Sequence, residues 1–205
     1  MSIQNKFINN TFWLLFGKIF RIMTNLIVVV LIARYLGPEE FGTYSYAYSL
    51  MQILSVIGGL GLDGILVRNL VNNESEKGVL VGTSLLMRFL FSLPLIALLS
   101  LIIFVLPNHE DIRIFVILIG SSIIFQSFNI IDYYFQSKVF SKYIVISNSI
   151  CLLLTSIIKL ILIAYGYPLI FFGIVILFEY LAIALGYIYV YYIHSKKSID
   201  WNFDF

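Results

Sequence analysis

Seven ionisable residues lie inside long apolar stretches of this sequence. Four are basic and three are acidic: Lys18, Arg21, Arg88 and Lys159, with Asp63, Asp132 and Glu179. A charged side chain at the centre of a bilayer costs about 2.5–3.5 kcal/mol even on the mildest insertion scale. We therefore expect each of these residues to face a partner of opposite charge or a water-filled cavity.

The spacing of these residues predicts polar stripes on helices. Lys18, Arg21 and Asn25 are separated by three and four residues, so they share one helical face. Pro94 is expected to kink its helix and to free carbonyl groups near Arg88. The other stripes are Ser84, Arg88 and Ser92; Ser122, Gln126, Asn129, Tyr133 and Gln136; and Asn148, Thr155 and Lys159.

The helices that carry these stripes are predicted to cross a membrane. Hydrophobic residues make up 60% of the 205, charged residues only 12%, and the mean hydropathy is +0.98. A crossing of roughly 30 Å needs about 20 apolar residues. The sequence predicts an all-α, polytopic protein with six spans of this kind: Asn10–Leu36, Thr43–Leu70, Val79–Leu106, Ile112–Gln136, Tyr143–Tyr165 and Pro168–Ile193.

Several classes of protein are disfavoured by the same pattern. Gly59, Gly61 and Gly64 spell a dinucleotide-binding motif, but a sixteen-residue apolar run precedes it and no acidic residue follows at the required spacing. The net charge of +2 is too small to indicate a nucleic-acid partner. The single cysteine, Cys151, has no partner for an internal disulfide. We expect no cofactor, no metal site and no catalytic site.

The distribution of basic residues predicts the orientation. If the N-terminus is cytoplasmic, seven cations lie in cytoplasmic connections and two, Arg34 and Arg113, lie outside. Cytoplasmic loops carry the excess of Lys and Arg. The expected arrangement is a multi-pass protein of the cytoplasmic membrane with both termini inside.

Simpler roles for the buried charges remain open from the sequence. Lys18 could extend its amine to the nearby interface. Arg21 and Arg88 could pair structurally with Asp63 or Glu179, and Asp132 could be a solvated or capping residue.

The segment "IARYLGPEEFGTYSYAYSL", which starts at Ile32, and the segment "GLGLDGILVRNLV", which starts at Gly59, resemble the polysaccharide-transporter or O-antigen flippase family. The resemblance covers essentially the whole chain, with strong motifs up to Val71 and little beyond hydropathy after that. It implies the fold of the multidrug, oligosaccharidyl-lipid and polysaccharide exporters, in which two bundles of six helices enclose a V-shaped cavity. Residues 1–205 would form the N-terminal bundle, because family members usually have about twice as many helices.

The resemblance implies that the substrate is an oligosaccharide linked to undecaprenyl pyrophosphate, moved across the membrane with a cation gradient. On this interpretation the pyrophosphate would meet Arg21 and Arg88, with Lys18 and Lys159 adding positive potential. Glycan hydroxyls would meet Gln126, Asn129 and Tyr133, and Asp63 and Glu179 would couple transport to the cation. Expected partners are this lipid-linked substrate, membrane lipids, a polysaccharide polymerase, and the C-terminal half or a second copy of the chain.

Three alternatives stay open. A multidrug antiporter of the same superfamily would favour buried acids over buried cations, which is the reverse of the balance here. A membrane-embedded transferase would need a catalytic cluster in a loop, and only His109 with Glu110 and Asp111 approaches one. A non-transporting subunit of the assembly machinery is the third. We also expect the 205 residues, which end in "WNFDF", to be a truncated or split half that does not transport alone.

Overall fold

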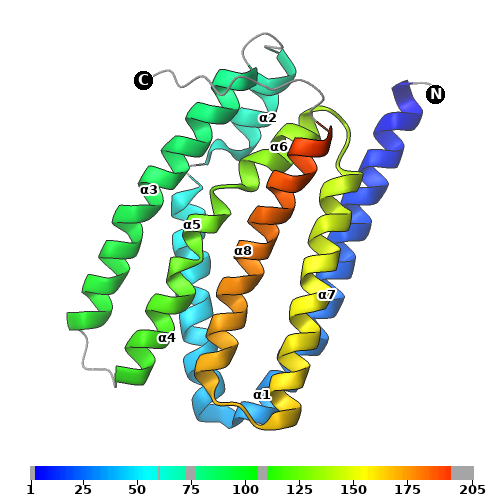
Figure 1. Ribbon diagram of the computed structural model, residues 1–205. Helices are drawn as coiled ribbons and strands as arrows, with labels where there is room; N and C mark the ends of the chain where they lie inside the picture. Colours follow the sequence, from blue (N-terminus) through cyan, green and yellow to red (C-terminus); the bar gives the residue numbers. More distant parts are fainter. Residues whose placement is uncertain (1–2, 60, 73–76, 106–109, 195–205) are drawn as a thin grey trace.

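The computed structural model describes residues 3–59, 61–72, 77–105 and 110–194 (Figure 1). Every element in these ranges is helical, which confirms the all-α prediction. Five helices are long and apolar enough to cross a membrane. The predicted count of six is not confirmed, because the first of the five runs over 68 residues and includes both of the first two expected spans. His109 and the segment 201–205 lie outside the described residues.

Helix α1, Ile3–Gly58, is one helix by its hydrogen bonds but two by its direction. At Gly37 the backbone has φ 71° and ψ −179°, a combination that is essentially restricted to glycine. Pro38 follows and cannot donate a backbone hydrogen bond. Figure 1 shows the chain reversing its direction within α1, at the lower end of the molecule. Helix α1 therefore consists of a first arm, 3–36, and a second arm, 38–58.

The second arm stops at Gly58, and the chain continues as α2, Leu62–Asn72. Gly61 between them has a positive φ of 63°. Of the glycines that resemble a nucleotide-binding turn, Gly59 and Gly61 therefore separate two helices, and Gly64 lies inside α2. Helix α3, Lys77–Val105, then runs the length of the bundle and remains helical through Pro94.

The fourth expected span is broken into three pieces: α4, Glu110–Ser121; α5, Ile123–Gln126; and α6, Asn129–Ser137. Through the breaks, the amides of Ser122, Phe125 and Phe128 bond to carbonyls three residues back instead of four. The hydroxyl of Ser122 also donates to the carbonyl of Ile119. Broken spans in transporters often line polar cavities, because unwound backbone needs polar surroundings.

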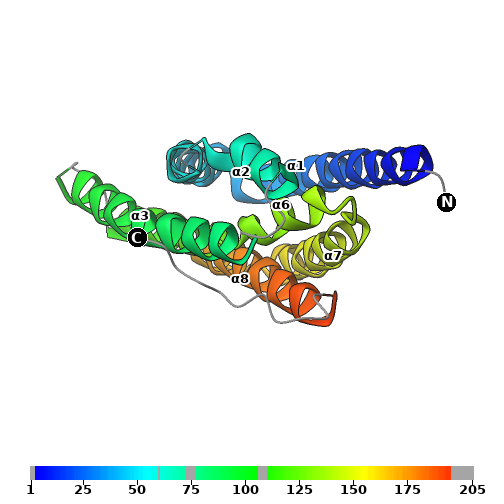
Figure 2. The same cartoon turned by 90° about the horizontal axis from the view of Figure 1, so that it is seen from above.

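Helices α7, Lys142–Tyr165, and α8, Leu169–His194, form a hairpin. Gly166 caps α7 in the left-handed conformation, with φ 72°. The turn after it is tied to α1, because the Tyr35 hydroxyl donates to the Tyr167 carbonyl at 2.8 Å. Seen from above, α1 and α2 lie along one side of the molecule, and α3, α8 and α7 lie along the other (Figure 2).

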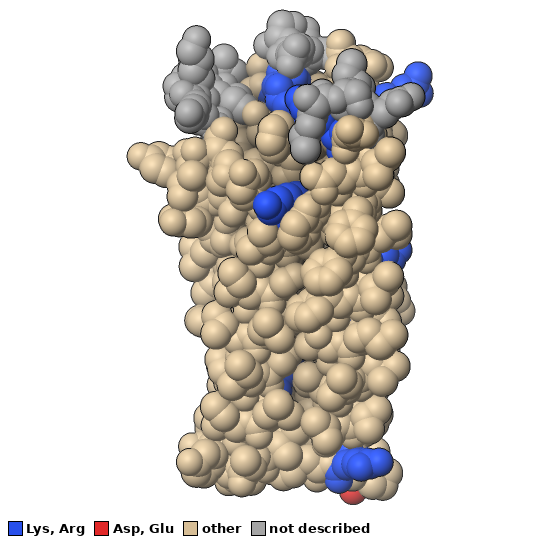
Figure 3. All heavy atoms as spheres, turned by 90° about the vertical axis from the view of Figure 1, so that its right-hand side faces the viewer, with Lys and Arg blue, Asp and Glu red and all other residues tan. Residues whose placement is uncertain are grey.

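The largest cluster of buried apolar side chains joins α1 to α3, α4, α7 and α8. Ile32, Met51 and Phe172 are among its fully buried members. The face in Figure 3 carries blue Lys and Arg side chains mainly towards one end, a smaller charged group at the other end, and a nearly uncharged band between them. This banding is typical of a bundle that is surrounded by hydrocarbon.

Candidate functional site

Arg88 of α3 is held at the junction between the second arm of α1 and α2. It is 5% exposed and forms an ion pair with Asp63. It also donates to the carbonyl of Gly59 at 3.0 Å, and its guanidinium carbon lies 5.4 Å from the centroid of the Tyr133 ring. The carbonyl that meets Arg88 is that of Gly59, and the expectation that Pro94 frees carbonyl groups near the arginine stays a prediction.

These groups line a pocket of about 240 Å³, which we call the α3 pocket; its polar walls are Ser55, Asp63, Arg88, Ser92, Gln126, Ser127, Asn129 and Tyr133. All three residues assigned to the glycan by the resemblance are in it. Gln126, however, already accepts a hydrogen bond from Ser55 at 2.6 Å and donates to the sulfur of Met51 at 3.2 Å. Its side chain is therefore occupied within the protein.

Lys159 and Glu179 form a second ion pair, between α7 and α8. The lysine Nζ lies 2.6 Å from the glutamate Oε2, and both residues are buried. Asp63 and Glu179, the two acids assigned to cation coupling, are thus both in ion pairs. Their partners, Arg88 and Lys159, are two of the four cations assigned to the substrate. The structural pairing that the sequence left open for Arg88 with Asp63 is present.

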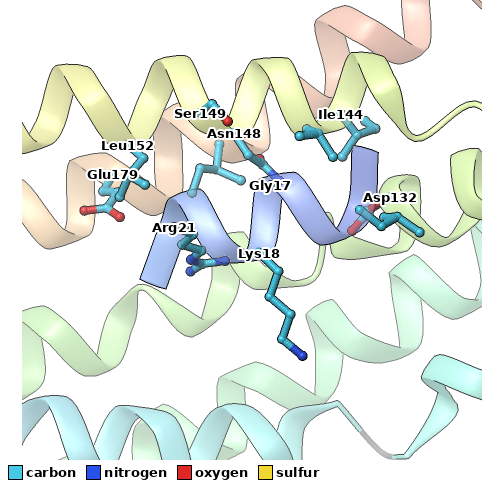
Figure 4. Close-up of a pocket in the computed structure, with 12 residues that line it drawn as sticks. Gly17, Lys18, Arg21, Asp132, Ile144, Asn148, Ser149, Leu152 and Glu179 are labelled. Carbon is cyan, nitrogen blue, oxygen red and sulfur yellow. The ribbon is translucent and has the colours of Figure 1, made fainter. Parts of the chain in front are cut away.

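Lys18 and Arg21 occupy a different position. They line a pocket of about 180 Å³, the α1 pocket, with Asp132, Asn148, Ser149 and Glu179. In Figure 4 the Lys18 side chain points away from α7, and Glu179 and Asp132 lie at opposite ends of the pocket. Among the described residues neither Lys18 nor Arg21 forms an ion pair. Both are exposed in the bundle.

The α1 pocket brings cationic and anionic side chains together. Lys18 and Arg21 are one helical turn apart, and neither forms an ion pair with Asp132 or Glu179, the two carboxylates that line the same pocket. Asn148 is fixed at its edge, because its amide donates to the Tyr187 hydroxyl at 2.9 Å. Within the described part of the chain, no group of three or more His, Cys, Asp or Glu could hold a metal ion.

Two features of the site were missed by sequence reasoning. Asp132, treated as a solvated or capping residue, lines the α1 pocket, and its Oδ1 is buried. A third pocket lies beside Lys159 and Glu179 and is lined by Tyr44, Tyr48 and Tyr180. The spacing of Phe41, Tyr44 and Tyr48 by three and four residues could have indicated an aromatic stripe there.

Comparison with known families decides the identification. Residues 7–203 match the model of the polysaccharide biosynthesis protein family. The chain belongs to this family. No curated protein and no solved structure matches it.

Membership of the polysaccharide biosynthesis protein family confirms the resemblance carried by the segments at Ile32 and Gly59. Together with the five long apolar helices, it identifies a multi-pass membrane protein. The buried ion pairs and polar pockets are therefore parts of a membrane bundle from this family.

Proposed function

We propose that the chain forms one wall of a flippase, which moves an oligosaccharide linked to undecaprenyl pyrophosphate across the cytoplasmic membrane for surface polysaccharide synthesis. On this proposal the protein is a transporter and not an enzyme. The family match supports a role in polysaccharide biosynthesis, and the polar pockets inside an apolar bundle supply the path.

The observation that carries the proposal is the pair of cations in the α1 pocket. A diphosphate needs charged hydrogen-bond donors in a place where water does not screen them, and arginine can bind two phosphate oxygens at once. Lys18 and Arg21 have no ion-pair partner among the described residues, so their charges are available to a ligand.

Arg88 and Lys159 contribute in a second way. Their charges are balanced by Asp63 and Glu179, so an arriving diphosphate must compete with a carboxylate for either of them. Release of the carboxylate would let it take up a proton or Na⁺, which is how Asp63 and Glu179 would couple transport to a cation gradient. On this proposal Lys18 and Arg21 bind the diphosphate first. Arg88 and Lys159 then exchange their carboxylate partners for the diphosphate.

The exposure of Lys18 and Arg21 supports a second bundle as partner. Two cations facing hydrocarbon would be costly, so the surface around them is completed by another six-helix bundle or a second copy of the chain. The first arm of α1 and the end of α8 lie at the same end of the molecule (Figure 1), where the positive-inside rule places the cytoplasm.

The test is export of surface polysaccharide by the complete protein in a strain that lacks its own flippase. Arg21→Ala should abolish export at a normal membrane level, and Arg21→Lys should restore it only in part, because lysine lacks the two-pronged donor. Loss of the protein from the membrane, or full export by Arg21→Ala, would contradict the assignment. Export of cationic drugs in place of polysaccharide would favour the antiporter.

A further inference from the structure

A third pocket of about 330 Å³, which we call the tyrosine pocket, lies between the two arms of α1 and the α7–α8 hairpin. Both arms of α1 contribute residues to it, as do α7 and α8. Its aromatic and small polar walls are Asn25, Phe41, Tyr44, Ser45, Tyr48, Ser49 and Tyr180. Lys159 and Glu179 complete it. Side chains from four separate segments thus converge on one space.

The charges of the tyrosine pocket cancel. Apart from the tyrosines, the ionisable residues that line this pocket are Lys159 and Glu179. They form an ion pair, with 2.6 Å between Nζ and Oε2. A ligand with a net charge would have no unmatched partner here. A neutral ligand with many hydroxyl groups fits better. The carboxylate, amide and hydroxyl oxygens of the pocket can accept hydrogen bonds from its hydroxyls, and the amide and ammonium groups can donate hydrogen bonds to them.

The tyrosines present flat apolar surface. Tyr44 and Tyr48 are parallel, with ring planes 1° apart and centroids 6.3 Å apart. Phe41 extends this row, stacked on Tyr44 at 6.0 Å. Tyr44 is buried, while Tyr48 is half-buried and reaches the pocket. A fixed aromatic ring beside hydroxyl and amide groups suits a pyranose, which has apolar C–H faces and a polar rim.

The α3 pocket offers less to a sugar. The amide of Gln126 is bonded at both ends, to Ser55 and to Met51. The Tyr133 ring has the Arg88 guanidinium over it at 5.4 Å. Hydrogen-bonding groups and an aromatic face are therefore more available in the tyrosine pocket than at the residues that the sequence assigned to the glycan.

The tyrosine pocket also adjoins the α1 pocket. Glu179 lines both pockets. Arg21 of the α1 pocket and Asn25 of the tyrosine pocket are four residues apart on the first arm of α1, which is about 6 Å along a helix axis. In a lipid-linked oligosaccharide the first sugar is attached directly to the diphosphate, so two sites one helical turn apart match neighbouring parts of one molecule.

We propose that the tyrosine pocket binds the sugar ring adjacent to the diphosphate, with Tyr48 stacked on the ring and Asn25 and Ser49 bonded to its hydroxyls. This inference rests on the proposed function, because it places the diphosphate at Lys18 and Arg21. It assigns recognition of the glycan to the two arms of α1 and leaves the α3 pocket with a structural or coupling role.

The experiment compares two lipids that differ only in the glycan. Undecaprenyl diphosphate and the native lipid-linked oligosaccharide, extracted from producing cells whose flippase is inactivated, are titrated against the complete protein in lipid nanodiscs. Tyr48→Ala and Asn25→Ala should each weaken binding of the oligosaccharide lipid by about tenfold and leave binding of undecaprenyl diphosphate unchanged. Arg21→Ala should weaken binding of both lipids.

Two further variants separate recognition from folding. Tyr48→Phe keeps the ring and should retain most of the affinity for the oligosaccharide lipid, and Tyr192→Ala, at an 83% exposed position on α8, should change nothing. Equal effects of Tyr48→Ala on the two lipids, or no effect on either, would overturn the inference while the flippase proposal stands. If neither lipid binds the unaltered protein, the flippase proposal and this inference both fail.

Discussion

Lys159 and Glu179 are joined by a 2.6 Å contact between Nζ and Oε2, although their side chains are only 7% and 11% exposed. The pair connects α7 to α8 at the wall between the α1 pocket and the tyrosine pocket. A buried pair of this kind contributes little compared with apolar side chains of the same size, but removal of one partner leaves an uncompensated charge. Its two members therefore depend strongly on each other.

Glu179→Gln should destabilise the bundle by about 3–5 kcal/mol, because Lys159 is left buried without its carboxylate. The effect should appear as a lower midpoint of thermal unfolding of the purified protein in detergent. Adding Lys159→Met should recover most of the loss, since the unpaired charge is then removed. An unchanged midpoint for Glu179→Gln would show that water reaches this pair.

Arg88→Ala and Arg21→Ala should differ in their effects on folding. Arg88 bonds to Asp63 and Gly59, so its loss disconnects α3 from the start of α2 and should reduce the amount of protein in the membrane. Arg21 has no ion pair in the described chain, and its replacement should leave that amount normal. Quantitative immunoblots of washed membranes check this. Equal membrane levels in both variants would remove the structural role given to Arg88.

Gly173→Ala should destabilise the contact between α8 and α4. A Cβ atom at Gly173 would lie 2.9 Å from the Phe115 ring and 3.0 Å from Leu118, and Phe115 is only 1% exposed. Overpacking of this kind costs about 1–3 kcal/mol. Gly64→Ala in α2 is the matched control, because nothing lies within 4 Å of its added Cβ. The midpoint of thermal unfolding should therefore fall for Gly173→Ala and stay unchanged for Gly64→Ala.

Gly37→Ala should be destabilising for a different reason. There is open space around Gly37, but its φ of 71° is unfavourable for a residue with a Cβ, at a cost of about 1–3 kcal/mol. Gly42→Ala, also in open space and within the helix, should be neutral or slightly stabilising. A Gly37→Ala protein as stable as its control would mean that the reversal of α1 does not need this conformation.

Labelling of single cysteines tests the proposed orientation. In a Cys151→Ala background, Glu39→Cys lies at the end of the bundle where α1 reverses, and Asn72→Cys lies at the end of α2; both positions are exposed. The excess of Lys and Arg in the connections at the N-terminal end predicts that end to be cytoplasmic. An impermeant thiol reagent added to intact cells should label the cysteine at 39 and spare the one at 72. The reverse pattern would invert the topology.

The long helices were predictable because apolar run length sets them directly. The run Tyr143–Tyr165 became α7, Lys142–Tyr165, and the run Pro168–Ile193 became α8, Leu169–His194. Interruptions within runs were harder to predict. The run Ile112–Gln136 looked continuous, but the hydroxyls of Ser121 and Ser122 bond to carbonyls three residues back where the span breaks. A hydropathy profile does not show where serine hydroxyls compete with backbone amides for the carbonyl groups of a helix.

The residues of the candidate site were visible in the sequence, but their pairing was not. Charged residues in apolar runs stand out by type, so Arg88, Asp63, Lys159 and Glu179 could all be selected. Which acid meets which base depends on how α2 and α3, or α7 and α8, align along their axes. That alignment is set by close packing, as where Gly173 admits Phe115, and no single span encodes it.

The short turn at Gly166 has a consequence for the synthesis of the protein. Lys159 and Glu179 are twenty residues apart, and the turn returns the chain so that they meet. Each helix alone would carry one charge into the lipid, at about 2.5–3.5 kcal/mol if it lies near the centre of the span. As a pair they enter neutralised. We therefore expect the hairpin of α7 and α8 to enter the membrane as one unit, and a longer turn to slow membrane integration of the protein.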